Sequence, residues 1–200
     1  WGGEKMREIV KLGLILFVIT AVAGGLLGFA NEITKEPIAK QVQQTKEEAM
    51  KQTLPQADKF ELIEVDLPED SIILEVNAGY KGDTLEGFAV KVAPKGYGGA
   101  IEMMIGVSKD GVLQGVKVVS HSETPGLGAN AQNAAFTSQY EGKSGELKVV
   151  KTTPGADDEI QAITGATITS KAVTSGVNEV LNLLKHWVDT DTNEIIFDFN

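Results

Sequence analysis

The chain has 200 residues, no cysteine, two histidines and a formal net charge of −10. This length suits one core-bearing domain with an appendage rather than two enzyme domains. Without cysteine the chain cannot form disulfides, thiolate-ligated iron–sulfur clusters or a cysteine nucleophile. Because His121 and His186 are isolated in the sequence, we expect no metal site. Any redox chemistry must therefore use an organic cofactor.

The N-terminal segment contains an apolar run that is long enough to cross a membrane. Residues 12–30 are nineteen residues without a charged side chain. At about 1.5 Å of rise per residue, such a helix roughly matches a hydrocarbon core of about 30 Å. Because basic residues precede the run, the positive-inside rule predicts that residues 1–11 are cytoplasmic and that the remainder is extracytoplasmic. We expect a single-pass protein of the inner (cytoplasmic) membrane.

A cleaved signal peptide is the alternative interpretation of this segment. Ala21-Val22-Ala23 has the small-x-small form of a cleavage site. The apolar run continues past it to Ala30, which favours an anchor that stays attached. The first residue here is Trp1, and Met6 is a candidate start of the natural chain.

The part of the chain that follows the apolar run is strongly acidic. Residues 31–200 hold 15 basic and 26 acidic side chains, a net charge of −11. Proteins bind nucleic acid largely through basic side chains that neutralise phosphates. Nucleic acid is therefore not an expected partner, and the charge mainly keeps a domain soluble at a membrane surface.

The pattern after residue 30 predicts a helix and then an α+β domain. Residues 31–55 are rich in Lys, Gln, Glu and Ala, with Pro37 near the expected helix start, so we expect a juxtamembrane helix or linker. Residues 56–200 should form an extracytoplasmic domain with an antiparallel sheet and flanking helices. The expected strands are 72–76, 87–92, 100–107, 112–120 and 147–151, and the expected helices are 130–139 and 172–188.

A hydroxyl-rich turn leads directly into the last expected helix. Residues 163–176 read Ile-Thr-Gly-Ala-Thr-Ile-Thr-Ser-Lys-Ala-Val-Thr-Ser-Gly, and apolar residues recur at helical spacing from Val173 onward. The helix should start just after Thr167, where free N–H groups and the helix dipole stabilise an anion such as phosphate. Residues that could instead cap the helix are Thr164, Thr167, Thr169 and Ser170. The turn alone does not decide between a cap and a phosphate site.

A second loop of glycines and polar residues follows the fourth expected strand. It reads His121-Ser122-Glu123-Thr124-Pro125-Gly126-Leu127-Gly128. Glycines permit positive φ and a close approach of backbone to a ligand, and loops at strand ends commonly carry binding residues. Taken alone, the loop reads as readily as a turn with a solvated carboxylate and a surface imidazole. A further candidate wall of the site is formed by Lys95, Tyr97, Gly98 and Gly99.

The two motifs, in this order after one apolar helix, resemble the FMN-binding domain family of ion-translocating electron-transport complexes. That family includes the G-type subunit of the Rnf complex and the C-type subunit of the sodium-pumping NADH:quinone reductase. The resemblance covers the whole layout of the chain and implies that FMN is attached through its phosphate to the second threonine of the turn, Thr167. The family usually has an acidic residue three positions before the turn's first hydroxyl residue, where this chain has Gln161.

The resemblance also assigns roles around the attachment residue. Cofactor-binding residues implied by the turn are Thr164, Gly165, Ala166 and Ser170, and those implied by the loop are His121, Glu123, Thr124, Gly126, Leu127 and Gly128. No residue is expected to be catalytic, because the chemistry belongs to the flavin. The residues by themselves leave the choice among Thr164, Thr167 and Thr169 open.

The implied function is that of an electron-relay subunit in a membrane complex that couples transfer between ferredoxin and NAD to the pumping of Na⁺ or H⁺. Expected partners are the other membrane subunits and, for maturation, an FAD-dependent flavin transferase. The modest chain length favours the Rnf protein over its counterpart in the quinone reductase. A membrane-anchored binding or sensor module without a redox role is the alternative from another class. A free-standing flavin reductase ranks last, because no Gly-x-Gly-x-x-Gly turn resembling a nicotinamide site is present.

Overall fold

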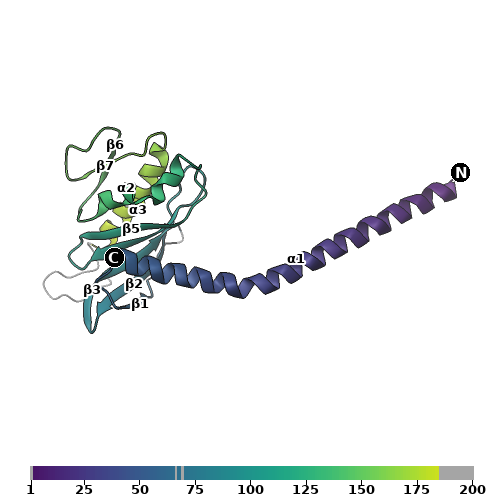
Figure 1. Cartoon of the computed structure of the whole chain (residues 1–200), viewed down its shortest axis with the longest axis horizontal. Coiled ribbons are helices and arrows are strands. Elements are labelled where there is room, and N and C mark those ends of the chain that lie inside the picture. The colour runs from purple at the N-terminus through teal and green to yellow at the C-terminus, as the bar shows by residue number, and fades with distance from the viewer. Residues whose placement is uncertain (1, 66, 69, 185–200) are drawn as a thin grey trace. The chain divides into compact units, whose positions relative to one another are not determined.

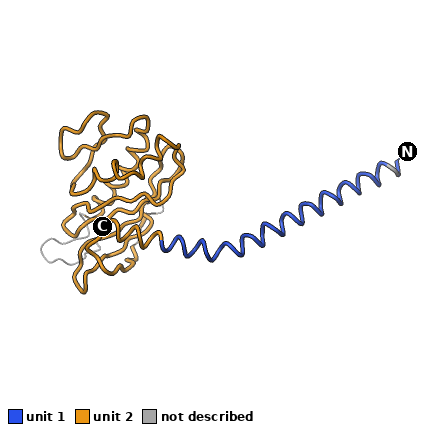
Figure 2. The backbone as a smooth tube through the Cα atoms, in the orientation of Figure 1, with its two compact units in different colours: residues 1–44 blue, residues 45–200 orange. Residues whose placement is uncertain are grey.

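The computed structural model describes residues 2–65, 67–68 and 70–184, and most of its helices and strands are labelled in Figure 1. The chain divides into two compact units, residues 1–44 and residues 45–200 (Figure 2). One helix runs through both units. The expected end of the last helix, residues 185–188, lies outside the described residues.

The N-terminal helix α1 spans Gly2–Thr53 without interruption. It joins the two segments that the sequence predicted separately, so Pro37 lies inside the helix and its placement near a helix start was wrong. Proline removes one backbone hydrogen bond from a helix. The flanking Lys, Glu, Gln and Ala residues are strong helix formers, and they continue the helix on both sides of Pro37.

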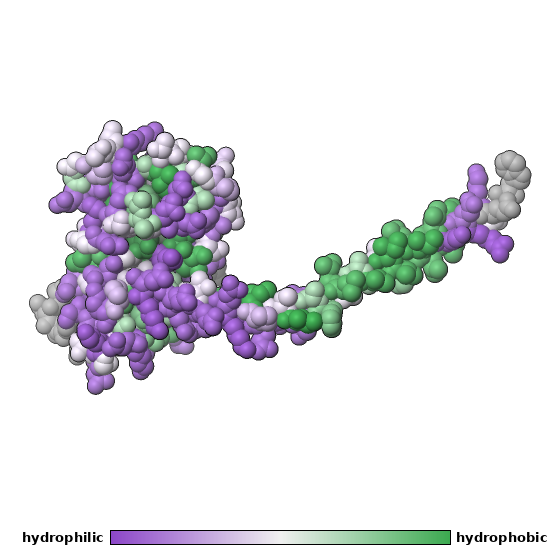
Figure 3. Space-filling model, in the orientation of Figure 1, coloured by the Kyte–Doolittle hydropathy of each residue, from purple (hydrophilic) through white to green (hydrophobic). Residues whose placement is uncertain are grey.

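The first unit carries the apolar run as an exposed helical surface. Phe17 is 69% exposed and Leu27 is 72% exposed, although large apolar side chains are usually buried in folded proteins. By length and composition, α1 is the one helix among the described residues that could cross a membrane. Its apolar surface is the green part of the extended segment in Figure 3.

The second unit is built on a five-stranded antiparallel meander in the order β1-β2-β3-β4-β5. Its strands are β1 (Lys59–Ile63), β2 (Ile73–Lys81), β3 (Thr84–Val92), β4 (Glu102–Ser108) and β5 (Leu113–Ser120). The four strands expected in this region are confirmed, and β2 and β3 extend further than expected. Sequence reasoning missed β1, an edge strand with a mixed charged and apolar sequence.

The two faces of the sheet are covered by different helices. Alternate residues of the central strands, such as Phe88, Val90 and Met103, lie in the core that includes α3 (Thr167–Leu184). On the opposite face, Ala49 and Met50 from the last turns of α1 form a second cluster with sheet residues. Both faces of the central strands are therefore buried, and the expected flanking helices are confirmed.

Glycines allow the two covering helices to approach the sheet closely. A Cβ atom at Gly176 of α3 would lie 2.3 Å from Met103 Cε, and a Cβ at Gly106 of β4 would lie 1.9 Å from the Thr53 carbonyl oxygen. Both distances are below any normal contact. The glycines therefore fix how near α3 and the end of α1 pack on the sheet.

Short elements connect β5 to α3. The helix expected at 130–139 is broken into η1 (Gly128–Gln132), α2 (Ala134–Thr137) and η2 (Ser138–Tyr140), because the Asn133 backbone is extended, with ψ 140°. The strand expected at 147–151 appears as β6 (Lys148–Val150). It pairs in parallel with β7 (Glu159–Gln161), which the sequence did not predict. β7 runs directly into the hydroxyl-rich turn.

Candidate functional site

The residue at the N-cap position of α3 has no side chain that can cap the helix. The Ser170 amide donates to the Ala166 carbonyl at 3.0 Å, the first i−4 bond of the helix, which places Ala166 at the N-cap position. Alanine has no side-chain acceptor for the first amides of a helix. The amides of residues 167–169 precede the i−4 ladder, so they stand at the positive end of the helix dipole. α3 begins at Thr167, close to the start that the turn predicted, whereas the later start expected at residue 172 was wrong.

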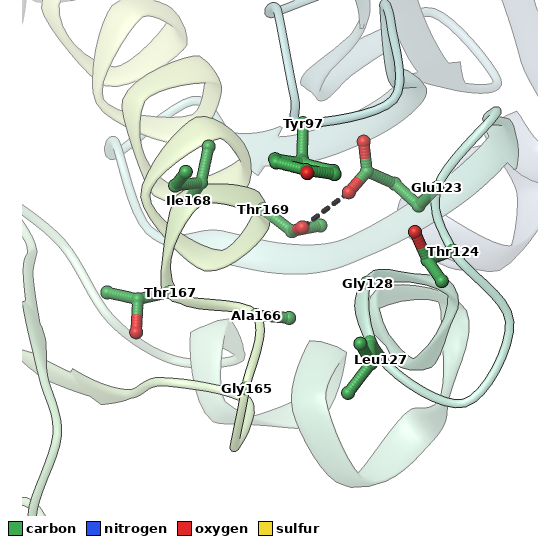
Figure 4. A pocket seen from close by; sticks show the side chains of 10 residues that line it. All are labelled: Tyr97, Glu123, Thr124, Leu127, Gly128, Gly165, Ala166, Thr167, Ile168 and Thr169. Carbon is green, nitrogen blue, oxygen red and sulfur yellow. Dashed lines mark hydrogen bonds between the residues drawn. The ribbon is translucent and has the colours of Figure 1, made fainter.

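A pocket of about 610 Å³ opens at this helix start (Figure 4). Three segments line it, and its lining residues are Tyr97, Glu123, Thr124, Leu127, Gly128, Gly165, Ala166, Thr167, Ile168 and Thr169. The pocket therefore joins the two motifs, which lie more than thirty residues apart in the sequence. Its volume falls in the range of small-molecule and cofactor sites.

Three large side chains that are mainly apolar stand exposed at the rim of the pocket. Tyr97 is 71% exposed, Ile168 is 57% exposed and Leu127 is 44% exposed. These side chains come from three different segments. Large exposed apolar side chains that gather at one cavity are typical of a ligand or partner site.

Thr167 is half-buried at the edge of the pocket. Figure 4 shows its hydroxyl pointing away from Glu123, on the opposite side of the backbone from the Ala166 methyl group. Gly165 has φ 77°, a conformation that glycine adopts without strain.

Glu123 is almost fully buried, with 5% exposure, and its carboxylate is engaged inside the protein. Oε1 accepts a hydrogen bond from the Gly98 amide at 2.8 Å, and Oε2 accepts one from the Thr169 hydroxyl at 2.5 Å. Glu123 thus joins the loop at 121–128 to two other segments. Each of its carboxylate oxygens therefore has a hydrogen-bond donor within the protein itself.

His121 does not line the pocket in this structure. Its Nδ1 accepts a hydrogen bond from the Glu123 amide at 3.1 Å, so the imidazole fixes the shape of the loop. Thr124, Leu127 and Gly128 do line the pocket. Gly126 has φ 78° and serves the turn of the loop rather than the lining.

Two hydroxyl residues of the turn also lie away from the pocket. Ser170 is fully buried, and its hydroxyl accepts from the Ile163 amide at 2.9 Å and donates to the Ala166 carbonyl at 3.0 Å. Thr164 is exposed and lines a separate depression that also includes Gln161. Of the four candidate caps, only Thr167 and Thr169 reach the pocket. The sequence left Thr169 open only as an attachment residue, and it did not assign the Ile168 side chain to the site.

The FMN-binding domain family matches residues 96–182, the stretch that holds every segment of the pocket. Residues 5–53, which make up most of α1, match the RnfG N-terminal region. The G subunit of an oxidoreductase complex from Acetobacterium woodii is 44% identical over 186 residues, which cover 86% of this chain and 89% of that protein. The chain belongs to the RnfG family.

Other members of the RnfG family match over similar lengths. The A. woodii protein is named as the G subunit of a Na⁺-translocating ferredoxin:NAD⁺ oxidoreductase complex. The G subunit of a proton-translocating ferredoxin:NAD⁺ oxidoreductase complex from Clostridium ljungdahlii is 39% identical, and 82% of this chain and 85% of that protein are covered. The G subunit of an ion-translocating oxidoreductase complex from Methanosarcina acetivorans is 32% identical over 88% of this chain and 94% of that protein.

A solved structure supports the fold of this RnfG chain. The C subunit of the Na⁺-translocating NADH-quinone reductase from Parabacteroides distasonis matches with a TM-score of 0.56 and 18% identity. The match covers 73% of this chain and 94% of that one. It confirms the expected α+β class with its antiparallel sheet.

Proposed function

We propose that this chain carries FMN as a phosphoester on Thr167 and relays electrons within a membrane-bound, ion-translocating ferredoxin:NAD⁺ oxidoreductase complex of the Rnf type. The observation that carries the proposal is the uncapped start of α3 at Ala166, which opens into a pocket bounded by both sequence motifs. The family match to the FMN-binding domain supports the cofactor. The names of the relatives support the complex.

The residues present fit a phosphate-linked flavin. The amides of residues 168 and 169 lie at the positive end of α3, where a phosphate anion is stabilised. Thr167 is half-buried at the edge of the pocket, which leaves its hydroxyl accessible to the phosphorus. The apolar rim formed by Tyr97, Leu127 and Ile168 suits a flat aromatic ring system.

Attachment needs a flavin donor and an enzyme to catalyse the transfer. With FAD as donor, the Thr167 oxygen forms a bond to the FMN phosphorus while the phosphoanhydride bond breaks. AMP leaves, and the transferase accepts the hydroxyl proton. The half-buried Thr167 is accessible for this step, whereas the hydroxyls of Thr169 and Ser170 are buried and paired within the protein.

A bound flavin supplies reversible electron transfer, and the protein sets its position and surroundings. The covalent link would prevent loss of the cofactor from an extracytoplasmic domain. We place residues 1–11 in the cytoplasm, residues 12–30 in the membrane and residues 56–200 outside, following the charges that flank the apolar run. In this arrangement the electron partners are other membrane subunits of the complex.

The experiment uses the full chain expressed in membranes together with a flavin transferase. A denaturing gel viewed under ultraviolet light should show a fluorescent band for the wild type. The band should disappear in Thr167→Val and persist in Thr164→Val, a matched control on the far side of the same turn. Absence of the band from the wild type would exclude covalent flavin and favour a non-redox binding or sensor module.

A further inference from the structure

Glu123 holds together the three segments that form the pocket. It belongs to the 121–128 loop, accepts from Gly98 of a second segment and accepts from Thr169 of α3. Thr169 is itself only 1% exposed. Gly98 precedes Glu123 by 25 residues and Thr169 follows it by 46, so these contacts are purely tertiary.

Glycines bring the neighbouring backbone close to the Glu123 carboxylate. A Cβ at Gly96 would lie 2.4 Å from Glu123 Oε1, and a Cβ at Gly128 would lie 2.4 Å from Oε2. A Cβ at Gly98 would lie 2.1 Å from the Ser122 carbonyl oxygen. Glycine at these three positions allows both neighbouring backbones to close on the carboxylate.

We propose that Glu123 is a positioning residue, which sets the geometry of the flavin attachment turn through its hydrogen bond with Thr169. This inference rests on the proposed function of Thr167. Thr169 lies two residues beyond Thr167 in the first turn of α3. The hydrogen bond to Glu123 holds the Thr169 side chain toward the protein interior. It therefore fixes the rotation of this turn about the helix axis and the direction of its backbone amides.

The same bond sets the width of the pocket. The 121–128 loop approaches the attachment turn through Leu127, whose Cδ2 would lie 3.0 Å from a Cβ at Gly165. Because Glu123 anchors this loop to α3, it fixes the distance between the Leu127 wall and the turn. The carboxylate accepts a hydroxyl and a loop amide, so it leaves the first amides of α3 available for the phosphate.

The test measures the rate at which the full chain incorporates flavin when a flavin transferase is coexpressed. Thr169→Val removes the hydrogen bond between α3 and Glu123. Flavin incorporation should then slow about tenfold, the loss expected when a buried charged group is left without one partner. Thr169→Ser keeps the hydroxyl and should restore the rate to within about twofold of the wild type. Glu102→Ala is the control, because Glu102 pairs with Lys91 outside the pocket.

The double variant tests whether Glu123 and Thr169 act as one unit. Glu123→Ala already removes the hydrogen bonds to both Gly98 and Thr169. The double variant Glu123→Ala/Thr169→Val should therefore incorporate flavin no more slowly than Glu123→Ala alone. A double variant about tenfold slower than Glu123→Ala would overturn the proposal, because the two residues would then act independently. A normal rate in Thr169→Val would overturn it as well.

Hydrogen exchange on the flavin-free chain tests the contact without any flavin. The Gly98 amide should exchange faster in Glu123→Ala, whereas amides in β3 and β4 should keep their protection. Unchanged exchange at Gly98 would overturn the proposal. A wild type that takes up no flavin would instead contradict the proposed function, and the exchange result would still decide whether Glu123 makes this contact.

Discussion

The two motifs that border the pocket differ in how their polar groups are used. The turn before α3 ends on Ala166 at the N-cap position, and this residue leaves the first helix amides without a side-chain cap. The 121–128 loop instead uses its imidazole and its carboxylate for internal hydrogen bonds. We propose that one segment receives an anion and that the other holds the receiving segment in place. A hydroxyl-rich helix start can therefore lack a side-chain cap, and a carboxylate in a motif can be used for internal hydrogen bonds.

The largest effect should follow from crowding the internally bonded loop. In Gly128→Ala the new Cβ would lie 2.4 Å from Glu123 Oε2 and 2.7 Å from Thr169 Oγ1. We expect a lower free energy of unfolding, by about 1–3 kcal/mol as in overpacked cores, together with loss of flavin incorporation. Urea denaturation of the detergent-solubilised chain and the fluorescent band measure the two effects.

Gly155→Ala is the matched control for this crowding. A Cβ at Gly155 would meet only Glu159 Oε2, at an ordinary 3.9 Å. Stability should be unchanged within about 0.5 kcal/mol, and incorporation should be normal. Equal losses in Gly128→Ala and Gly155→Ala would show that the loop has no special role.

A smaller effect of opposite sign should follow from capping the open turn. In Ala166→Ser the new hydroxyl can accept from an amide of the first turn of α3, which should stabilise the flavin-free chain by about 0.5–2 kcal/mol. The same hydroxyl would compete with the phosphate for that amide, so flavin incorporation should slow. Thermal unfolding and the fluorescent band measure the two effects. An increase in both stability and incorporation would contradict an anion site at this turn.

The smallest effect should come from a buried polar contact outside both segments. Tyr140 is fully buried, and its hydroxyl lies 2.7 Å from Thr174 Oγ1 of α3. Tyr140→Phe should lower the free energy of unfolding by about 1 kcal/mol, the usual net value of one hydrogen bond. Flavin incorporation should stay normal, because the contact lies outside the pocket lining.

The buried Tyr140 side chain should also make the free energy of unfolding depend on pH in the alkaline range. Burial raises the pKa of this phenol above its ordinary value of about 10, although the hydrogen bond with Thr174 lowers it in part. The folded state therefore keeps the proton to higher pH than the unfolded state. The stabilising contribution is complete below about pH 10 and is lost as the pH rises above it. Chemical denaturation at a series of alkaline pH values should therefore show a shallower loss of stability in Tyr140→Phe than in the wild type.

Much of the fold was predictable because it depends on local patterns. Apolar alternation and turn residues indicated four of the five meander strands, and helical spacing indicated α3. The strands that were missed give weaker local signals. β1 is a partly charged edge strand, and β7 has only three residues, whose pairing with β6 depends on tertiary packing.

The site was predictable in outline but not in the roles of its residues. The two motifs were brought together as expected, and Thr167 lies at the helix start. The direction of each hydroxyl depends on contacts between distant segments, which one sequence does not show. Ser170 faces the turn ahead of the helix, and Glu123 faces Thr169 at a separation of 46 residues.

The central claim is that Thr167, at the uncapped start of α3, carries the flavin. Trypsin should release residues 152–171 as one peptide, which contains Thr164, Thr167, Thr169 and Ser170. Mass spectrometry of this peptide, from chain expressed with a flavin transferase, should show an added FMN phosphoryl group, and the fragment ions should place it on Thr167. An unmodified peptide, or a flavin on Thr164 or Thr169, would contradict the claim.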